Sequence, residues 1–183
     1  MCRSMKVTVI GRGNVGGGLA GLWRKAGHDV QELGKDGGDA SDSDAVLLAV
    51  PSDAIRDALG SVEGVEGKVL IDATNALGGR DDEFESLAHE AKSVTSGPTA
   101  KSFNLNFAAA YDKLGEQQER PSMPWAGDED ARETTERLIR DAGYEPVPVG
   151  GLENARKLED ALPFVFAVRQ AAGEPVLYRF WTP

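Results

Sequence analysis

A glycine-rich hexapeptide near the N-terminus has the spacing needed to hold a pyrophosphate. It reads Gly11-Arg12-Gly13-Asn14-Val15-Gly16 and fits the pattern G-x-G-x-x-G. In this pattern the first glycine permits a sharp turn, the second lets the backbone approach the pyrophosphate, and the third allows a helix to pack closely on a strand. The free amides at the start of that helix attract negative charge. The hexapeptide therefore predicts a dinucleotide site, with a glycine-rich turn that binds nothing as the alternative.

The segments on either side of the hexapeptide supply the strand and the helix that the motif requires. Residues 7–10 form a β-branched, mainly apolar run, which is typical of a buried strand. Apolar side chains at helical spacing follow the glycines. They are Val15, Leu19, Leu22, Trp23 and Ala26. We expect a strand, a tight turn and a helix, which is the context in which the motif is specific.

The residue that follows the second strand distinguishes a site for NAD from a site for NADP. NAD is normally held there by an Asp or Glu that binds the ribose hydroxyl. If the second strand covers residues 29–33, this position falls on Gly34, which has no carboxylate to repel a 2′-phosphate. Lys35 and Arg12 could both pair with that phosphate. We therefore expect NADP(H) rather than NAD.

Two neighbouring acids oppose this expectation. Glu32 would occupy the acid position if the strand ended earlier, and Asp36 offsets part of the charge of Lys35. An ordinary surface lysine is the alternative interpretation of Lys35.

The other strand ends carry backbone, small polar groups and amides. Ligands bind beyond the carboxyl ends of the strands in an open parallel sheet. These ends carry no Ser/His/Asp set and no paired carboxylates, so we predict binding and orientation without a protein acid or base, and the catalytic residues are left unknown. Asp72 is expected to cap its loop, His28 to be a turn residue and His89 an exposed helix residue. The predicted cofactor-binding residues at these ends are Ala49, Val50, Pro51, Ser52, Thr74, Asn75 and Asn104, together with Lys35 and the hexapeptide.

Strand and helix signals alternate along the chain and predict a Rossmann-like, doubly wound α/β fold with a mostly parallel sheet. Segment 34–43 is too short and too rich in Gly, Asp and Ser for the usual second crossover helix. The expected strands are 7–10, 28–33, 45–50, 69–71, 99–103, 123–126 and 144–149, and the expected helices after the first begin near residues 55, 84, 107, 128 and 152.

The C-terminal part is predicted to be one long helix from residue 152, kinked at Pro163, followed by an apolar tail. That tail contains four large apolar or aromatic side chains, which we expect to be covered rather than exposed to water. They are Leu177, Tyr178, Phe180 and Trp181. These side chains either pack within the chain or contact a second subunit. We predict the second arrangement, a homodimer. We divide the chain into a dinucleotide-binding domain, 1–150, and a C-terminal helix and tail, 151–183, within the same compact unit.

Composition narrows the class of protein further. The chain has 183 residues, 40% hydrophobic and 27% charged, which suits one domain. Its 30 acidic against 20 basic residues give a net charge of −10, so we expect no nucleic acid partner. No apolar run approaches the ~18 residues of a membrane span, and the N-terminus lacks a secretory pattern, so a cytoplasmic location without membrane association is expected. With one cysteine and two histidines, we predict no metal site.

As an ordered set, several segments resemble the deazaflavin (coenzyme F-420)-dependent NADP oxidoreductase family over nearly the whole chain. The resemblance implies NADP(H) along the strand ends and hydride exchange with a flat acceptor, a deazaflavin or a flavin, as the small-molecule partner. Archaeal members carry Ser-Arg where this chain has Gly34-Lys35. A dinucleotide-binding sensor or partner subunit without catalysis is the alternative function. The segments are 6–16, 26–30, Ala49-Val50-Pro51, 67–75, Lys101-Ser102-Phe103-Asn104, Ala126-Gly127-Asp128 and 151–159.

Overall fold

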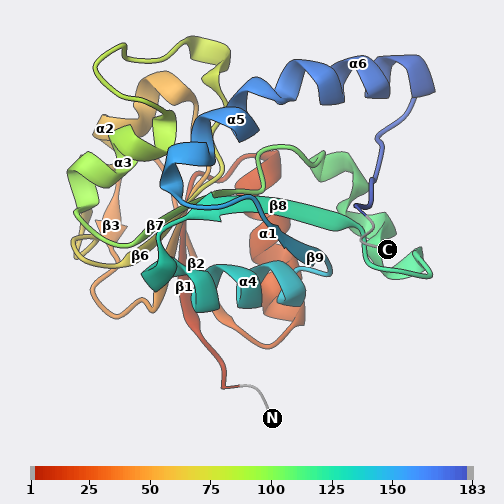
Figure 1. The fold of residues 1–183 in the computed structure, drawn as a ribbon. Coiled ribbons are helices and arrows are strands. Elements are labelled where there is room, and N and C mark those ends of the chain that lie inside the picture. The colour runs from red at the N-terminus through yellow and green to blue at the C-terminus, as the bar shows by residue number, and fades with distance from the viewer. Residues whose placement is uncertain (1–2, 181–183) are drawn as a thin grey trace.

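A seven-stranded sheet runs through the middle of the molecule in the computed structural model, which describes residues 3–180 (Figure 1). Its order is β2-β1-β4-β6-β7-β8-β9, and all neighbours are parallel except β7 and β8. This is the predicted Rossmann-like, mostly parallel α/β fold. The strands are β1 (Lys6–Ile10), β2 (Asp29–Leu33), β4 (Ala45–Leu48), β6 (Val69–Asp72), β7 (Thr99–Ser102), β8 (Ser122–Gly127) and β9 (Glu145–Pro148), and the short β3 (Gly38–Asp39) pairs with β5 (Val62–Glu63).

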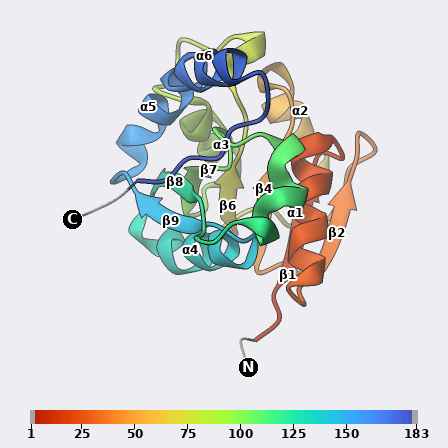
Figure 2. The same cartoon turned by 90° about the vertical axis from the view of Figure 1, so that its right-hand side faces the viewer.

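Helices cover both faces of this sheet (Figures 1 and 2). Helices α1 and α4 lie on one face, and α2 and α3 lie on the other. The α-helices are α1 (Asn14–Lys25), α2 (Ile55–Gly60), α3 (Leu87–Thr95), α4 (Arg132–Asp141), α5 (Ala155–Asp160) and α6 (Leu162–Ala172). The 3-10 helices are η1 (Ser52–Ala54), η2 (Ala76–Gly78), η3 (Ala108–Glu116), η4 (Glu129–Ala131) and η5 (Leu152–Asn154).

Alternate side chains of the central strands supply two separate cores. Val9 and Leu47 pack with Trp23 under α1 and α4. Ile10 and Leu48 belong to the core under α2 and α3. Both sides of each strand are therefore buried, which explains why these strands are apolar without alternation.

Two predicted helices differ from the observed ones. The helix expected from residue 84 begins at Leu87, because Ser86 caps it by accepting a hydrogen bond from the His89 amide. The segment expected to be an α-helix from residue 107 is the 3-10 helix η3. Its buried side chains are Ala110, Tyr111 and Leu114, and the last two pack in the core under α1.

The single kinked C-terminal helix is instead two helices. Ala161 ends α5 and also precedes α6, and Pro163 lies in the first turn of α6. Proline lacks the amide that a helix interior needs but is well tolerated in a first turn, so it starts the second helix there. Both helices lie at the end of the sheet opposite the N-terminus (Figures 1 and 2).

Part of the apolar tail packs within the chain. The Tyr178 hydroxyl donates to Asn106 Oδ1 at 2.6 Å, and the Ser122 amide donates to the Tyr178 carbonyl at 2.8 Å. Leu177 packs against the core under α1. Trp181, also named in the tail, lies outside the described residues. Across residues 3–180, none of the helices has the length and apolar character to span a membrane.

Candidate functional site

The three motif glycines occupy three different environments. Gly11 has φ +109°, and a Cβ there would lie 2.2 Å from the Ala49 carbonyl oxygen. A Cβ on Gly16 would lie 2.0 Å from the Gly11 carbonyl oxygen, so strand, turn and helix are in direct backbone contact. Gly13 is exposed, precedes α1, and has nothing within 4 Å of its Cβ position. The turn therefore needs Gly11 and Gly16 for its own packing and leaves an open approach at Gly13.

A crevice of about 580 Å³ opens between the carboxyl ends of β1 and β4. The chain leaves β1 toward β2 on one side of the sheet and returns to β4 on the other, which makes this the topological switch point of the sheet. Ligands of open α/β sheets bind at such a point. The lining residues are Ile10, Gly11, Arg12, Gly13, Gly34, Lys35, Ala49, Val50, Pro51, Ala54, Asp57, Ala58 and Ser61.

One wall of this crevice was missed from the sequence. Ala54, Asp57, Ala58 and Ser61 come from η1, α2 and the residue after α2. The pairs 54/58 and 57/61 are four residues apart and so share one side of a helix. That spacing is the signal that could have predicted this wall.

The basic end of the crevice is built around Gly34. Strand β2 ends at Leu33, so the acid position does fall on Gly34, as the longer strand register predicted. Arg12 lies over this glycine, with its Nε and Nη2 donating to the Glu32 carbonyl at 3.3 and 3.0 Å. A Cβ on Gly34 would lie 3.4 Å from Arg12 Nη1. Gly34 thus gives the guanidinium room to lie close to the backbone.

The neighbouring acids do not occupy this end. The Glu32 carboxylate accepts from Arg24 Nη1 at 2.7 Å, and neither residue lines the crevice. Lys35 is exposed at the crevice edge and makes no hydrogen bond or ion pair with any residue that the structure describes. Arg12 and Lys35 therefore line the crevice together with Gly34. Glu32 and Asp36 are not part of this lining, and Asp57 lines another part of the crevice.

The predicted amides lie further along the same edge of the sheet. Asn75 Nδ2 donates to the Asn104 carbonyl at 2.9 Å, and Asn104 Nδ2 donates to Asn75 Oδ1 at 3.1 Å. Asn104 Nδ2 also donates to the Leu158 carbonyl of α5 at 3.0 Å. The structure therefore brings these two amides together, with Asn104 the more buried of the pair.

Several predicted residues do not line the crevice itself. Thr74 and Asn75 follow β6, and Asn104 follows β7. In the sheet, β6 is two strands away from β1, so these residues lie outside the crevice lining. Ser52 is buried and accepts from the Gly78 amide at 3.1 Å, which ties the loop after β4 to the loop after β6. The remaining three form the first turn of α1 behind Gly13. They are Asn14, Val15 and Gly16.

A buried charge cluster behind these amides was not expected from the sequence. Lys101 is fully buried, and its Nζ donates to Asp72 Oδ2 at 2.7 Å and to the Thr74 carbonyl at 2.6 Å. Glu159 Oε1 lies 3.3 Å from the same Nζ. Two carboxylates thus meet at one ammonium, whereas the strand ends read from the sequence carried no paired acids. Glu159 belongs to α5, far along the chain from the two strands. Lys101, a charged residue inside strand 99–102, is the one feature of the sequence that could have indicated the cluster.

Asp72 has the capping role that was predicted for it. Its Oδ1 accepts from the Thr74 amide at 2.8 Å and from Thr74 Oγ1 at 2.6 Å. Both oxygens are therefore occupied, one by Thr74 and one by Lys101.

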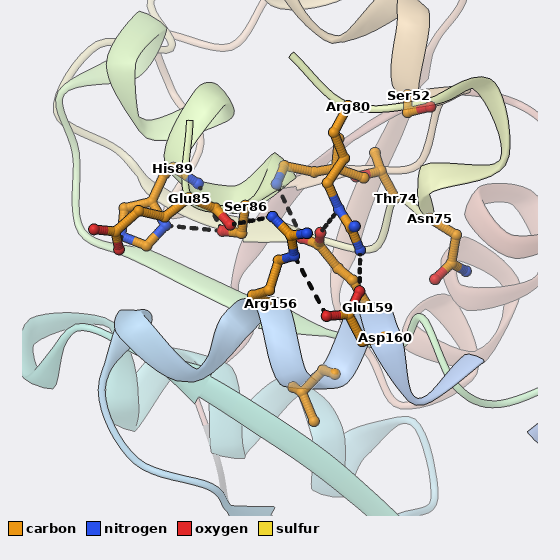
Figure 3. Close-up of polar contacts among 12 residues, drawn as sticks. Ser52, Thr74, Asn75, Arg80, Glu85, Ser86, His89, Arg156, Glu159 and Asp160 are labelled. Carbon is orange, nitrogen blue, oxygen red and sulfur yellow. Dashed lines mark hydrogen bonds and ion pairs between the residues drawn. The ribbon is translucent and has the colours of Figure 1, made fainter. Parts of the chain in front are cut away.

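The segment between η2 and α3 is fastened to α5 by arginines (Figure 3). Arg80 Nε donates to Glu159 Oε2 and its Nη2 to Asp160 Oδ1, both at 2.7 Å. Partial burial lowers the pKa of Arg80, but these hydrogen bonds outweigh it and leave the pKa raised. Burial likewise raises the pKa of Asp160, and hydrogen bonds from Arg80 and Arg156 outweigh it and lower that pKa. Arg156 also donates to the Glu85 carbonyl at 3.4 Å.

The two histidines lie away from the crevice and are less free than expected. His28 is buried, with Nδ1 accepting from the Met5 amide at 3.1 Å and Nε2 2.9 Å from Asp141 Oδ2. His89 is half-buried in the first turns of α3, with Nδ1 2.8 Å from Ser86 Oγ. The described part of the chain contains no group of three or more His, Cys, Asp or Glu placed to hold a metal.

Comparison with known proteins gives structural matches alone. No protein-family model and no curated protein matches the chain. A protein of Arthrobacter sp. FB24, provisionally described as an F420-dependent NADP reductase, is 20% identical with a TM-score of 0.82, and the match covers 98% of this chain and 100% of that one. A hypothetical protein of Sinorhizobium meliloti is 24% identical with a TM-score of 0.64, covering 82% and 86% of the two chains.

A longer protein contains the same fold as part of its length. A reductive aminase from Aspergillus terreus, in complex with NADPH and ethyl levulinate, is 14% identical with a TM-score of 0.67. The match covers 93% of this chain but 64% of the aminase. At these identities the likeness establishes the Rossmann-like fold.

Proposed function

We propose that this chain is an NADP(H)-dependent oxidoreductase that passes a hydride between the nicotinamide and a flat acceptor, such as a deazaflavin or a flavin. The observation that carries the proposal is the crevice at the switch point of the sheet, open at Gly13 and basic beside Gly34. The NADPH named with the reductive aminase and the F420 named with the Arthrobacter protein support the two substrates.

The residues present fit a dinucleotide phosphate. Gly13 and the first amides of α1 would hold the pyrophosphate in the open space at Gly13, which a larger side chain would fill. Arg12 and Lys35 would pair with the 2′-phosphate. The apolar wall of Val50, Ala54 and Ala58 would receive the adenine.

The chemistry that these residues support is orientation. The bound nicotinamide, when reduced, supplies the hydride. Pro51 would press on the nicotinamide side of the site, and Asn75 and Asn104 would fix the carboxamide or the acceptor. Pro51, Asn75 and Asn104 carry no group suited to proton transfer near neutral pH. Asp72 and Lys101 do, but both are fully buried and bonded to each other. We therefore propose a hydride step without a protein acid or base.

Calorimetric titration with NADP and NAD tests cofactor choice. We expect tighter NADP binding, and Lys35→Ala or Arg12→Ala should weaken NADP binding by about ten- to hundredfold, since each removes a charge-assisted hydrogen bond. Binding of NAD should change little. Lys25→Ala removes an exposed lysine from the far end of α1 and is the matched control. Equal or tighter binding of NAD by the unmodified protein would refute the preference.

A second assay separates an enzyme from a sensor. NADPH oxidation is followed with coenzyme F-420, FMN and FAD in turn as acceptors. Turnover with one of them supports the oxidoreductase. Tight NADPH binding without turnover on any of the three would favour the non-catalytic sensor or partner subunit.

A further inference from the structure

Lys101 lies where a buried strand would ordinarily place an apolar side chain. It is 0% exposed, and its Nζ reaches Asp72 Oδ2, the Thr74 carbonyl and Glu159 Oε1. The ammonium donates hydrogen bonds to Asp72 Oδ2, the Thr74 carbonyl and, at 3.4 Å, Thr74 Oγ1, and Glu159 is its second ion-pair partner. Apolar replacements of buried ion pairs are often neutral or stabilising, so stability by itself does not account for such a cluster.

The contacts of Lys101 converge on a single backbone segment. The register of β6 and β7 places Asp72 opposite Lys101. From there Asp72 Oδ1 holds the amide and hydroxyl of Thr74, while Lys101 Nζ holds its carbonyl at 2.6 Å. The peptide group between Thr74 and Asn75 is therefore fixed through its oxygen. This peptide leads directly into Asn75, whose side-chain amide exchanges hydrogen bonds with Asn104.

We infer that Lys101 is a positioning residue, which sets the Thr74–Asn75 segment so that the Asn75 amide meets the nicotinamide end of the dinucleotide. The inference rests on the proposed function, because it assigns that end of the ligand to Asn75. Lys101 itself touches no ligand, since it is fully buried behind Thr74.

Arg80 provides a comparison within the same cluster. It donates to Glu159 and Asp160 and makes no hydrogen bond to Thr74. Lys101 pairs with Asp72 and Glu159 inside the protein, whereas Arg80 is partly exposed and pairs with Glu159 and with the exposed Asp160 (Figure 3 shows the Arg80 side). Loss of either cation disturbs the charge of the cluster, but only loss of Lys101 frees the Thr74 carbonyl.

The test measures how much the nicotinamide adds to binding. Dissociation constants are determined for NADPH and for 2′-phospho-ADP-ribose, a fragment that lacks the nicotinamide. The quotient is the dissociation constant of the fragment divided by that of NADPH, and it measures how much the nicotinamide contributes to binding. The main variant is Lys101→Met with Asp72→Asn, which removes one charge of each sign and retains Asp72 Oδ1 as the acceptor for Thr74. The control is Arg80→Met. Circular dichroism verifies that each variant is folded.

We expect the unmodified protein to bind NADPH about five- to tenfold more tightly than the fragment, the worth of a net hydrogen bond. The quotient should fall to about one in the double variant, with fragment binding nearly unchanged, and should persist in Arg80→Met. A persisting quotient in the folded double variant overturns the role of Lys101, as does an equal loss in Arg80→Met. Failure of the unmodified protein to bind either ligand overturns the proposed function instead.

A milder variant covers the case in which the double variant does not fold. Lys101→Gln with Asp72→Asn keeps an amide donor that can reach toward the Thr74 carbonyl. We expect it to retain part of the quotient. A quotient lowered toward one in this variant, with an unchanged quotient in Arg80→Met, assigns the effect to position 101. A quotient in this variant as high as that of the unmodified protein would contradict the role of Lys101.

Discussion

At the scale of single residues, the three glycines of the turn have separable functions. Gly16 has a neighbouring carbonyl where a side chain would lie, and Gly13 has open space there. The same substitution should therefore damage the fold at one position and ligand binding at the other.

Gly16→Ala should lower the free energy of unfolding by about 1–3 kcal/mol or more, because its Cβ overlaps the Gly11 carbonyl. Gly13→Ala should cost about 1 kcal/mol or less, since the φ of −76° at Gly13 suits alanine and only the weaker N-cap preference of alanine opposes the change. It should nevertheless weaken NADPH binding by about tenfold or more, through contact with the pyrophosphate. Urea unfolding and calorimetry measure the two effects. Wild-type affinity in Gly13→Ala would contradict the proposed phosphate site.

Loss of Asn75 should separate binding of the cofactor's phosphates from turnover. Asn75→Ala should reduce turnover about tenfold or more, equivalent to about 1.4 kcal/mol of barrier, because the nicotinamide or acceptor is less well oriented. NADPH affinity should fall by no more than the roughly five- to tenfold that the nicotinamide adds, and binding of 2′-phospho-ADP-ribose, which depends on the phosphates, should not change. Gln117→Ala, an exposed amide on the surface, is the control. The comparison uses steady-state kinetics with whichever acceptor supports turnover, and equal losses in both variants would refute the assignment.

The rate of the hydride step should change little between mildly acidic and neutral pH. The reason is that the mechanism uses no protein acid or base. Single-turnover kinetics with NADPH deuterated at C4 measures this step directly. A full isotope effect with a steep protonation limb that is assignable to Asp72, Lys101 or His28 would instead indicate a conventional dehydrogenase.

At the scale of elements, one indole joins the helices of the α1 face. Trp23 of α1 is fully buried, donates from Nε1 to the Leu138 carbonyl of α4 at 2.8 Å, and packs edge-on against Phe103. Trp125 of β8 is equally buried, but its Nε1 has no hydrogen-bond partner among residues 3–180.

Trp23→Phe should therefore destabilise the protein more than Trp125→Phe. Both changes remove similar volume, but only the first removes a hydrogen bond, so we expect a difference of about 1 kcal/mol in the free energy of unfolding. Urea unfolding of the two variants under identical conditions measures it. Equal losses would show that the Trp23 hydrogen bond adds nothing to the contact between α1 and α4.

At the scale of the whole molecule, α6 leaves a large apolar surface open. Phe164 is 71% exposed and Val168 39%, whereas Leu162 and Val165 of the same helix are buried. Since Leu177 and Tyr178 of the tail pack within the chain, the predicted homodimer now rests on this helix face.

Light scattering at micromolar concentration should give the mass of a dimer, and Phe164→Glu should give that of a monomer, because a charge on the buried side of an interface is costly. Leu77→Glu, at a 78% exposed residue outside α6, is the control and should remain dimeric. A monomeric mass for the unmodified protein removes the prediction. The division of the chain at residues 150 and 151 also stays a prediction.

The sequence by itself determined the strand, turn and helix around residues 6–25, the parallel sheet, and the absence of an acid at Gly34. These features depend on local period, turn chemistry and a motif read over a few residues. The strand ends read from the sequence also placed Asn75 and Asn104 on one edge of the sheet, and the two amides do meet there.

Only the tertiary structure decided what surrounds those residues. Arg12 lies over Gly34 because β1 and β2 are neighbours, and Glu32 meets Arg24 because α1 packs beside β2. Glu159 reaches Lys101 only because α5 packs against the ends of β7 and β8, and no local pattern encodes that contact. Charges and walls supplied from distant segments depend on long-range packing, which periodicity along the chain does not specify.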